Sequence, residues 1–136
     1  MGTEGSDPEF EYEAPFAALL DMRPGQCDDG VGSATMPVRG DHLQDAGAVQ
    51  GGLIVALADY AFFRAVNSVL RPGQSSVTIE LKLNFIAPAR DGELTATSRV
   101  LSAGRRVIVG DMQVTDHRQK LIASGLGTCL VIQEQP

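Results

Sequence analysis

The hydrophobic pattern of this chain changes its period at one point, the segment 71–73, Arg-Pro-Gly. Before this segment, over about residues 51–70, apolar side chains recur at helical spacing, and after it, over residues 77–85, they alternate with polar ones. Proline cannot continue a helix and glycine tolerates the turn that follows, so we expect the helix to stop there. The fold must therefore pack one long helix against strands.

The first strand after this helix is expected to bury one face and expose the other. The buried face is predicted to carry the apolar residues Val77, Ile79, Leu81, Leu83 and Phe85. Three more strand candidates, residues 93–101, 105–115 and 120–132, are separated by short polar turns at 102–104 and 116–119. Short connections imply antiparallel neighbours, so the sequence predicts an α+β fold in which a curved antiparallel sheet wraps a long central helix.

The part of the chain before the long helix is less regular. Residues 14–22 are expected to form a short helix that the segment 23–25 ends, residues 30–38 a weak strand, and residues 39–47 a polar loop. Residues 1–10, rich in Gly, Glu, Ser, Asp and Pro, are interpreted as a disordered leader or a tag remnant. Residues 11–136 then form one domain, because the chain is too short for two ordinary ones.

Composition argues against several functions. The net charge of −6 argues against nucleic acid or an anionic membrane surface as the main partner. No apolar run reaches the roughly 20 residues that span a bilayer, and the opening residues contain no apolar stretch of a signal peptide, so a cytoplasmic location is expected. Cys27 and Cys129 are far apart and lack metal-ligand spacing, and we expect no metal and no other cofactor.

Asp59 is the one acid within the long apolar helix. A polar stripe at helical spacing, predicted to face solvent, consists of Tyr60, Arg64, Asn67, Ser68 and Arg71, and Asp59 lies off it. Its carboxylate should therefore point toward packed protein or a cleft, where a charge needs a reason. Either Asp59 is a catalytic carboxylate, or it bonds a backbone N–H or a cation and only fixes packing.

The residues around the start of the helix carry a family resemblance. His42, Gln44 and Gly47 precede the run Gln50-Gly51-Gly52, and Asp59 follows within the helix. This pattern resembles the signature of hotdog-fold acyl-CoA thioesterases of the phenylacetic-acid-pathway type, and the similarity spans roughly residues 16–132.

The resemblance implies a hotdog fold and an acyl-CoA substrate. It also implies active sites at the boundary between subunits, with a homodimer as the minimal unit and a homotetramer as the commoner assembly. Asp59 would be the catalytic carboxylate, either as nucleophile on the thioester or as base for a water.

Thioester hydrolysis needs an oxygen nucleophile and a group that holds the negative charge appearing on the carbonyl oxygen. Asp59 meets the first need. The start of the helix, with unpaired N–H groups and the positive dipole end, meets the second through Gly51, with Gly52 in support. Alternatively, the two glycines only permit a tight turn or close packing.

Three other polar residues are candidates for the same site. Gln50 stands where the family usually has histidine, and it can donate a hydrogen bond but cannot titrate. Gln44 stands where related enzymes usually have asparagine, and either orients water or substrate or caps the loop. Thr78 matches a Ser/Thr position that can orient the attacking water, or is an ordinary strand threonine. His42 and His117 lie in polar segments and are expected to be solvated or locally hydrogen-bonded.

Substrate contacts are expected from two further groups. Phe62 and Phe63 are candidates for the acyl pocket, or belong to the core. Arg90, Arg105 and Arg106 lie near turns where the family binds the nucleotide end, so they are candidates for the phosphates of coenzyme A, or are surface charges.

The leading hypothesis is thus an acyl-CoA thioesterase. Because Gln50 replaces the usual histidine, the alternative is a non-catalytic acyl-CoA-binding or regulatory hotdog protein. A hotdog hydratase or dehydratase ranks lower, because the Asp/His pair that those enzymes use is not found. Motifs for nucleotide binding and for a serine-esterase elbow are also missing from the sequence.

Overall fold

The computed structural model describes residues 9–134, and these form one long helix and an antiparallel sheet. The elements, in chain order, are α1 (Pro15–Leu20), β1 (Arg23–Asp28), β2 (Val31–Pro37), a 3-10 turn (Gly40–His42), α2 (Gly51–Asn67), β3 (Gln74–Phe85), β4 (Glu93–Ala103), β5 (Val107–Thr115) and β6 (Leu121–Gln133). Within residues 9–134, no helix is both long and apolar enough to cross a bilayer.

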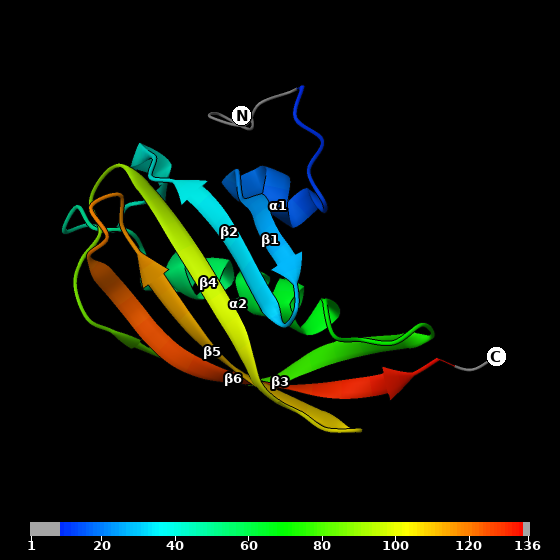
Figure 1. Cartoon of the computed structure of the whole chain (residues 1–136). Helices are drawn as coiled ribbons and strands as arrows, with labels where there is room; N and C mark the ends of the chain where they lie inside the picture. The colour runs from blue at the N-terminus through cyan, green and yellow to red at the C-terminus, as the bar shows by residue number, and fades with distance from the viewer. Residues whose placement is uncertain (1–8, 135–136) are drawn as a thin grey trace.

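The sheet has the strand order β1-β2-β4-β5-β6-β3, and every neighbouring pair is antiparallel. It curves around α2, which contacts all six strands (Figure 1). The predicted α+β architecture, with a curved antiparallel sheet around a central helix, is confirmed. β3 comes directly after α2 in the chain but pairs only with the last strand, β6. β3 therefore forms one edge of the sheet, and β1, which pairs only with β2, forms the other.

Phe62 anchors α2 to the middle of the sheet. Its side chain is fully buried, and its ring lies against Gly110 and Gly127, which face each other on β5 and β6. A Cβ at Gly127 would stand 2.7 Å from the Phe62 ring, so only glycine lets the ring lie this close to the strands. The contact of the Phe62 ring with these glycines therefore sets the distance between α2 and the sheet.

The N-terminal part differs from the prediction. Helix α1 ends at Leu20, with Asp21 in the left-handed conformation (φ 55°), and residues 23–28 form the edge strand β1 instead of a loop that only stops the helix. Proline is tolerated there because an edge strand does not need every N–H for pairing, and Pro24 pairs in register with Ala34 of β2. The weak strand predicted at residues 30–38 is confirmed as β2.

The prediction that the odd-numbered apolar residues of β3 share one face is wrong. A β-bulge between Thr78 and Glu80 inserts Ile79 as an extra residue opposite β6. Leu81 therefore faces the core, whereas Val77 and Ile79 are 45% and 58% exposed. The same bulge leaves Thr78 facing α2.

The predicted solvent stripe on α2 is also wrong at Arg64, which is only 8% exposed. Its guanidinium donates to both carboxylate oxygens of Glu13 at 2.9 Å and to the carbonyl oxygens of Gly25 (2.7 Å) and Gln26 (3.3 Å). Glu13 also accepts a hydrogen bond from the Tyr60 hydroxyl. The N-terminal segment and β1 thus cover the helix face that the sequence assigns to water.

The N-terminal boundary of the domain is described only in part. Residues 1–8 of the predicted leader lie outside the described residues. Phe10, which the same prediction includes, packs edge-on against Tyr12 and lies 4.3 Å from the Arg23 guanidinium carbon. Packed structure therefore reaches at least to Phe10.

Candidate active site

Asp59 lies midway along α2, on the side that meets β3. It is half-buried, and its Oδ1 accepts a hydrogen bond from the Thr78 hydroxyl at 3.3 Å. Burial raises the pKa of Asp59 above its usual value, and the Thr78 hydrogen bond offsets part of this rise because it stabilises the charged form. A carboxylate of raised basicity is suited to take a proton from water or to attack a carbonyl carbon.

Cys129 lies behind Thr78 and was not among the predicted site residues. It is 1% exposed, and its Sγ is 3.7 Å from the Thr78 hydroxyl oxygen. Burial raises the pKa of this thiol, so it stays neutral beside Asp59 at pH 7. Thr78 and Cys129 are cross-strand partners in the register of β3 and β6. Correct alignment of those two strands was the only signal that could have revealed the contact.

The start of α2 is held by the preceding loop. Gln50 is the N-cap residue, its side chain is exposed and makes no capping hydrogen bond, and its backbone N–H donates to the His42 carbonyl at 2.9 Å. Gly51 and Gly52 are the first two helical residues, so their N–H groups have no acceptor within the helix. A Cβ at Gly51 would lie 3.2 Å from the Phe85 ring. The start of α2 at Gly51 therefore carries a backbone N–H without an acceptor in the helix and lies beside an aromatic ring.

A cavity of about 330 Å³ adjoins this helix start. It is lined by Gln44, Ala48, Val49, Gly51, Ile54 and the segment 85–89. The Gln44 side-chain oxygen accepts a hydrogen bond from the Ala46 N–H, which is the loop-capping alternative for this residue. Its amide nitrogen has donors left for a bound molecule. The cavity is apolar apart from Gln44 and the helix start, as a binding site for an acyl or pantetheine chain requires.

Asp59 and Gly51 are not brought together within one protomer. Eight residues separate them on one helix, which corresponds to about 12 Å along the axis. A nucleophile and an oxyanion donor must both come within about 3 Å of the same carbonyl group. The two halves of the predicted site therefore lie apart on a single chain.

The predicted substrate-binding residues are also dispersed. Phe62 is enclosed between α2 and the sheet and has no exposed surface, whereas Phe63 is 45% exposed. Arg90 donates to the Ala46 carbonyl at 3.0 Å, close to the start of α2. Arg105 and Arg106 lie in the turn after β4, and Arg105 lines a cavity with Val69, Leu70 and Arg71 beyond the other end of α2.

The two histidines differ from each other. His42 is only 2% exposed, and its Nδ1 accepts a hydrogen bond from the Arg39 N–H at 3.2 Å, so the expected local hydrogen bond is present. Burial, and then the nearby Arg39 charge, lower the pKa of His42, and it is neutral at pH 7. His117 is exposed in the turn between β5 and β6. Neither histidine is near Asp59 in sequence or has a hydrogen bond to it.

Comparison with known proteins identifies the family. The family model described as the thioesterase superfamily matches residues 46–123, which include the start of α2, Asp59 and Thr78. The chain belongs to the thioesterase superfamily. As a member it is classed with the thioester hydrolases, and its fold is the hotdog fold that the resemblance implied.

Relatives of the thioesterase superfamily extend this similarity. The acyl-coenzyme A thioesterase PaaI of Escherichia coli is 33% identical over 97 residues, which are 71% of this chain and 67% of that protein. Its structure superimposes with a TM-score of 0.83 over 90% of this chain and 88% of PaaI, at 29% identity. A thioesterase from Haemophilus influenzae gives a TM-score of 0.85 at 26% identity, over 91% of this chain and 87% of that one.

One relative matches a smaller share of its own length. A protein from Saccharolobus solfataricus, whose name assigns it provisionally as an esterase, is 39% identical over 88 residues. The match spans 65% of this chain and 58% of that protein.

Proposed function

We propose that this thioesterase-superfamily member hydrolyses acyl-CoA thioesters to the free acid and coenzyme A, with Asp59 as the nucleophile or general base. The observation that carries the proposal is the Asp59 carboxylate itself. It is half-buried on the central helix, it has a raised pKa and it is oriented by the Thr78 hydroxyl. A purely structural acid would be expected to pair with a cation or a backbone N–H, and among the described residues Asp59 has neither.

The distance between Asp59 and Gly51 leads us to place each active site between two subunits. Asp59 of one subunit would act with the Gly51 N–H of the other, because a second, antiparallel α2 can bring its start level with the middle of the first helix. The edge strand β3 can form the contact between the two subunits, since its free edge can pair with the same strand of another copy.

The chemistry follows from these positions. In the general-base route, Asp59 takes a proton from a water whose oxygen attacks the thioester carbonyl carbon. The carbonyl oxygen becomes negatively charged and accepts a hydrogen bond from Gly51 N–H, with Gly52 in support. The intermediate then expels the coenzyme A sulfur as thiolate, which takes up a proton. In the nucleophilic route, Asp59 attacks the carbonyl carbon itself, the C–S bond breaks and coenzyme A leaves as thiolate, which takes up a proton. Water then cleaves the acyl–Asp59 anhydride, which releases the free acid and restores the carboxylate.

Substrate contacts are proposed from the residues near these two points. Gln44 and Gln50 are close to the start of α2 and can donate hydrogen bonds to the thioester or to water. Exposed Phe63 is a candidate wall of the acyl site, and the geometry does not favour Phe62. Arg90 is the candidate for the coenzyme A phosphates near the helix start, and Arg105 and Arg106 remain candidates from the second subunit.

The test is complementation between two inactive variants. Asp59→Asn removes the carboxylate, and Gly51→Pro removes the N–H while proline remains compatible with the first helical position. The Gln50 backbone (φ −56°, ψ 129°) is not helical, and its ψ lies in the range that a residue before proline prefers. Each variant alone should lose at least about a hundredfold in kcat/KM on an acyl-CoA panel. Mixed subunits should recover up to about one quarter of wild-type activity, because half of the random dimers contain one intact site.

Gly51→Ala is the matched control, because it adds a Cβ near Phe85 but keeps the N–H. It should retain more activity than Gly51→Pro. Two inactive variants that never complement each other would refute the shared site. Absence of thiol release from every acyl-CoA by the wild-type protein would refute the enzyme.

A non-catalytic acyl-CoA-binding protein is the second candidate, and exposed, uncharged Gln50 favours it because no titratable side chain stands there. Calorimetry combined with turnover separates the two. Tight acyl-CoA binding without hydrolysis by the wild-type protein favours the binding protein, whereas hydrolysis that Asp59→Asn abolishes favours the enzyme.

A further inference from the structure

A second cavity lies beyond the C-terminal end of α2, and neither Asp59 nor Gly51 lines it. It encloses about 330 Å³, within the size range of small-molecule sites. Its walls come from the segment 69–71 after α2, Gln74 at the start of β3, the turn 103–105, and Ile108 and Val131. We call it the C-end cavity. Asn67, the last residue of α2, already lies about 12 Å along the helix axis from Asp59.

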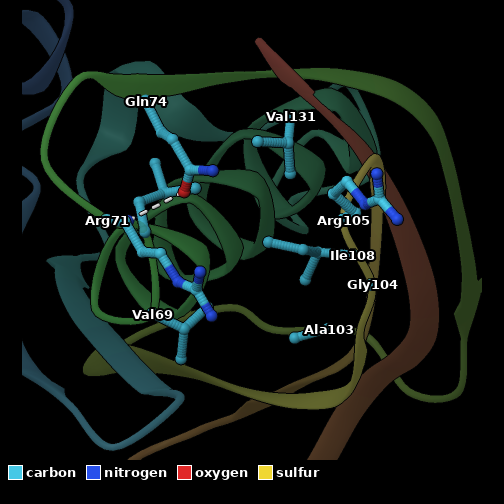
Figure 2. A pocket seen from close by; sticks show the side chains of 9 residues that line it. Val69, Arg71, Gln74, Ala103, Gly104, Arg105, Ile108 and Val131 are labelled. Carbon is cyan, nitrogen blue, oxygen red and sulfur yellow. Dashed lines mark hydrogen bonds between the residues drawn. The ribbon is translucent and has the colours of Figure 1, made fainter. Parts of the chain in front are cut away.

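The C-end cavity combines apolar walls with two cations. Figure 2 shows the side chains of Arg71 and Arg105 on opposite sides of the cavity, with Ile108 and Val131 between them. Within residues 9–134, neither guanidinium has an ion pair or hydrogen bond, although this protein carries a net charge of −6. The side-chain oxygen of Gln74 accepts a hydrogen bond from the Arg71 backbone N–H at 2.8 Å. The NH₂ group of Gln74 is therefore free to donate.

The local electrostatics favour an anion. The end of α2 carries the equivalent of about half a negative charge, which opposes an anion, but two guanidinium charges outweigh it. Glu134 is anchored nearby through its backbone N–H to the Gly73 carbonyl at 2.8 Å, yet it does not line the cavity. A planar carboxylate matches a guanidinium in shape and hydrogen bonds.

We propose that the C-end cavity binds a small carboxylic acid with an apolar body, its carboxylate between Arg71 and Arg105 and its hydrocarbon part against Val69, Leu70, Ile108 and Val131. A free phosphate would leave these apolar walls unused, and a nucleotide would press polar sugar against them. The carboxylic acid is therefore the class of ligand that uses both halves of the site. The proposal does not depend on the proposed hydrolysis of thioesters.

The experiment is calorimetric titration of the full-length protein with octanoate at pH 7 and low salt. One saturable site is expected, with 1-octanol binding at least about tenfold more weakly because it has no charge for the arginines. Arg71→Gln and Arg105→Gln should each weaken octanoate binding about tenfold. Ala103→Leu, which adds bulk at an exposed position of the cavity wall, should weaken it as well.

Arg106→Gln is the matched control, because Arg106 lies in the same turn but does not line the cavity, and octanoate binding should change less than about twofold. Asp59→Asn should also leave octanoate binding unchanged, which separates this site from the proposed reaction. Equal binding of octanoate and 1-octanol would overturn the proposal, as would equal losses in Arg105→Gln and Arg106→Gln. Displacement of octanoate by coenzyme A or inorganic phosphate would assign the arginines to phosphate instead and also overturn it.

Discussion

At the scale of single residues, Asp59 is subject to two opposing influences. Burial disfavours its charged form and raises its pKa, whereas the hydroxyl of Thr78 donates to that charged form and lowers it. The balance leaves the pKa above the ordinary value of an aspartate. A base in this position is more basic than a surface aspartate.

Thr78→Val should move the acidic limb of the pH profile upward. The variant removes the hydrogen bond that stabilises the charged carboxylate, so the pKa of Asp59 should rise further. The measurement is the pH dependence of kcat/KM for an acyl-CoA that the wild-type protein hydrolyses. Thr78→Ser keeps a hydroxyl and should keep the wild-type profile. A Thr78→Val profile with an unshifted limb would contradict the assignment of that limb to Asp59.

Asp59→Asn should raise the melting temperature at neutral pH. Because the folded-state pKa of Asp59 lies above its unfolded value of about 3.8, the folded protein holds a proton that the unfolded chain has already lost. Stability is therefore lost as pH rises from about 3.8 through the folded-state pKa, and asparagine avoids that cost. The difference in Tm between variant and wild type should be positive at pH 7 and should close as the pH falls toward 4. A difference that grows on acidification would contradict this account.

At the scale of elements, the N-terminal segment and β1 depend on Arg64. Its guanidinium connects Glu13 to the backbone carbonyls of Gly25 and Gln26 across α2. Glu13 remains 43% exposed, so the ion pair itself contributes little, and the hydrogen bonds of the buried guanidinium matter more.

Arg64→Met should lower the free energy of unfolding by about 2 kcal/mol, because it leaves two backbone carbonyls without their donor and leaves Glu13 with only the Tyr60 hydroxyl. Glu13→Gln should cost about 1 kcal/mol or less, because solvent screens the exposed partner. Urea unfolding of both single variants and the double variant measures these values and their coupling. Equal losses in the two single variants would mean that the ion pair dominates after all.

The sequence predicted α2, the strands from β2 to β6 and the antiparallel pairing of β4, β5 and β6, because each rests on a hydrophobic period and a short polar turn. The expected meander in chain order is wrong for β3, which pairs with β6 instead of with β4, the next strand in the chain. It did not predict β1, since Pro24 and Gly25 read as a turn unless the strand is known to lie at an edge. It assigned Arg64 to solvent, because helical spacing cannot reveal that residues 13, 25 and 26 cover that face. Asp59 and Thr78 were both predicted as site residues. The bulge that turns Thr78 toward Asp59 could not be predicted, because the residues of β3 alternate regularly in the sequence. The contact between Thr78 and Cys129 could not be predicted for the same reason.

At the scale of the whole molecule, the free edge of β3 and the distance between the two halves of the site both point to assembly. The outer face of the sheet near this edge also exposes apolar residues, among them Ile79, Leu126 and Leu130. Exposed apolar surface of this kind favours contact with another protein surface. A homotetramer and a cytoplasmic location stay predictions.

Specific activity should fall on dilution, because the proposed site exists only between subunits. Sedimentation velocity should show at least a dimer of the 14.4 kDa chain at the concentrations where activity is constant. Activity and the dimer fraction should then decline together as the protein is diluted. Full activity of a species that sediments as a monomer would exclude a shared site.

The bulge at Ile79 shows that strand pairing, and not only residue identity, determines this site. If Ile79 were paired regularly with β6, and Leu81 still faced inward, Thr78 would point away from Asp59, although every amino acid would be unchanged. A relative of the same length whose strand is regular at this position could therefore align well by residue type and yet present no hydroxyl to its acid. The pairing of this strand, and not the alignment alone, should separate members that share the oriented carboxylate from members that merely share the fold.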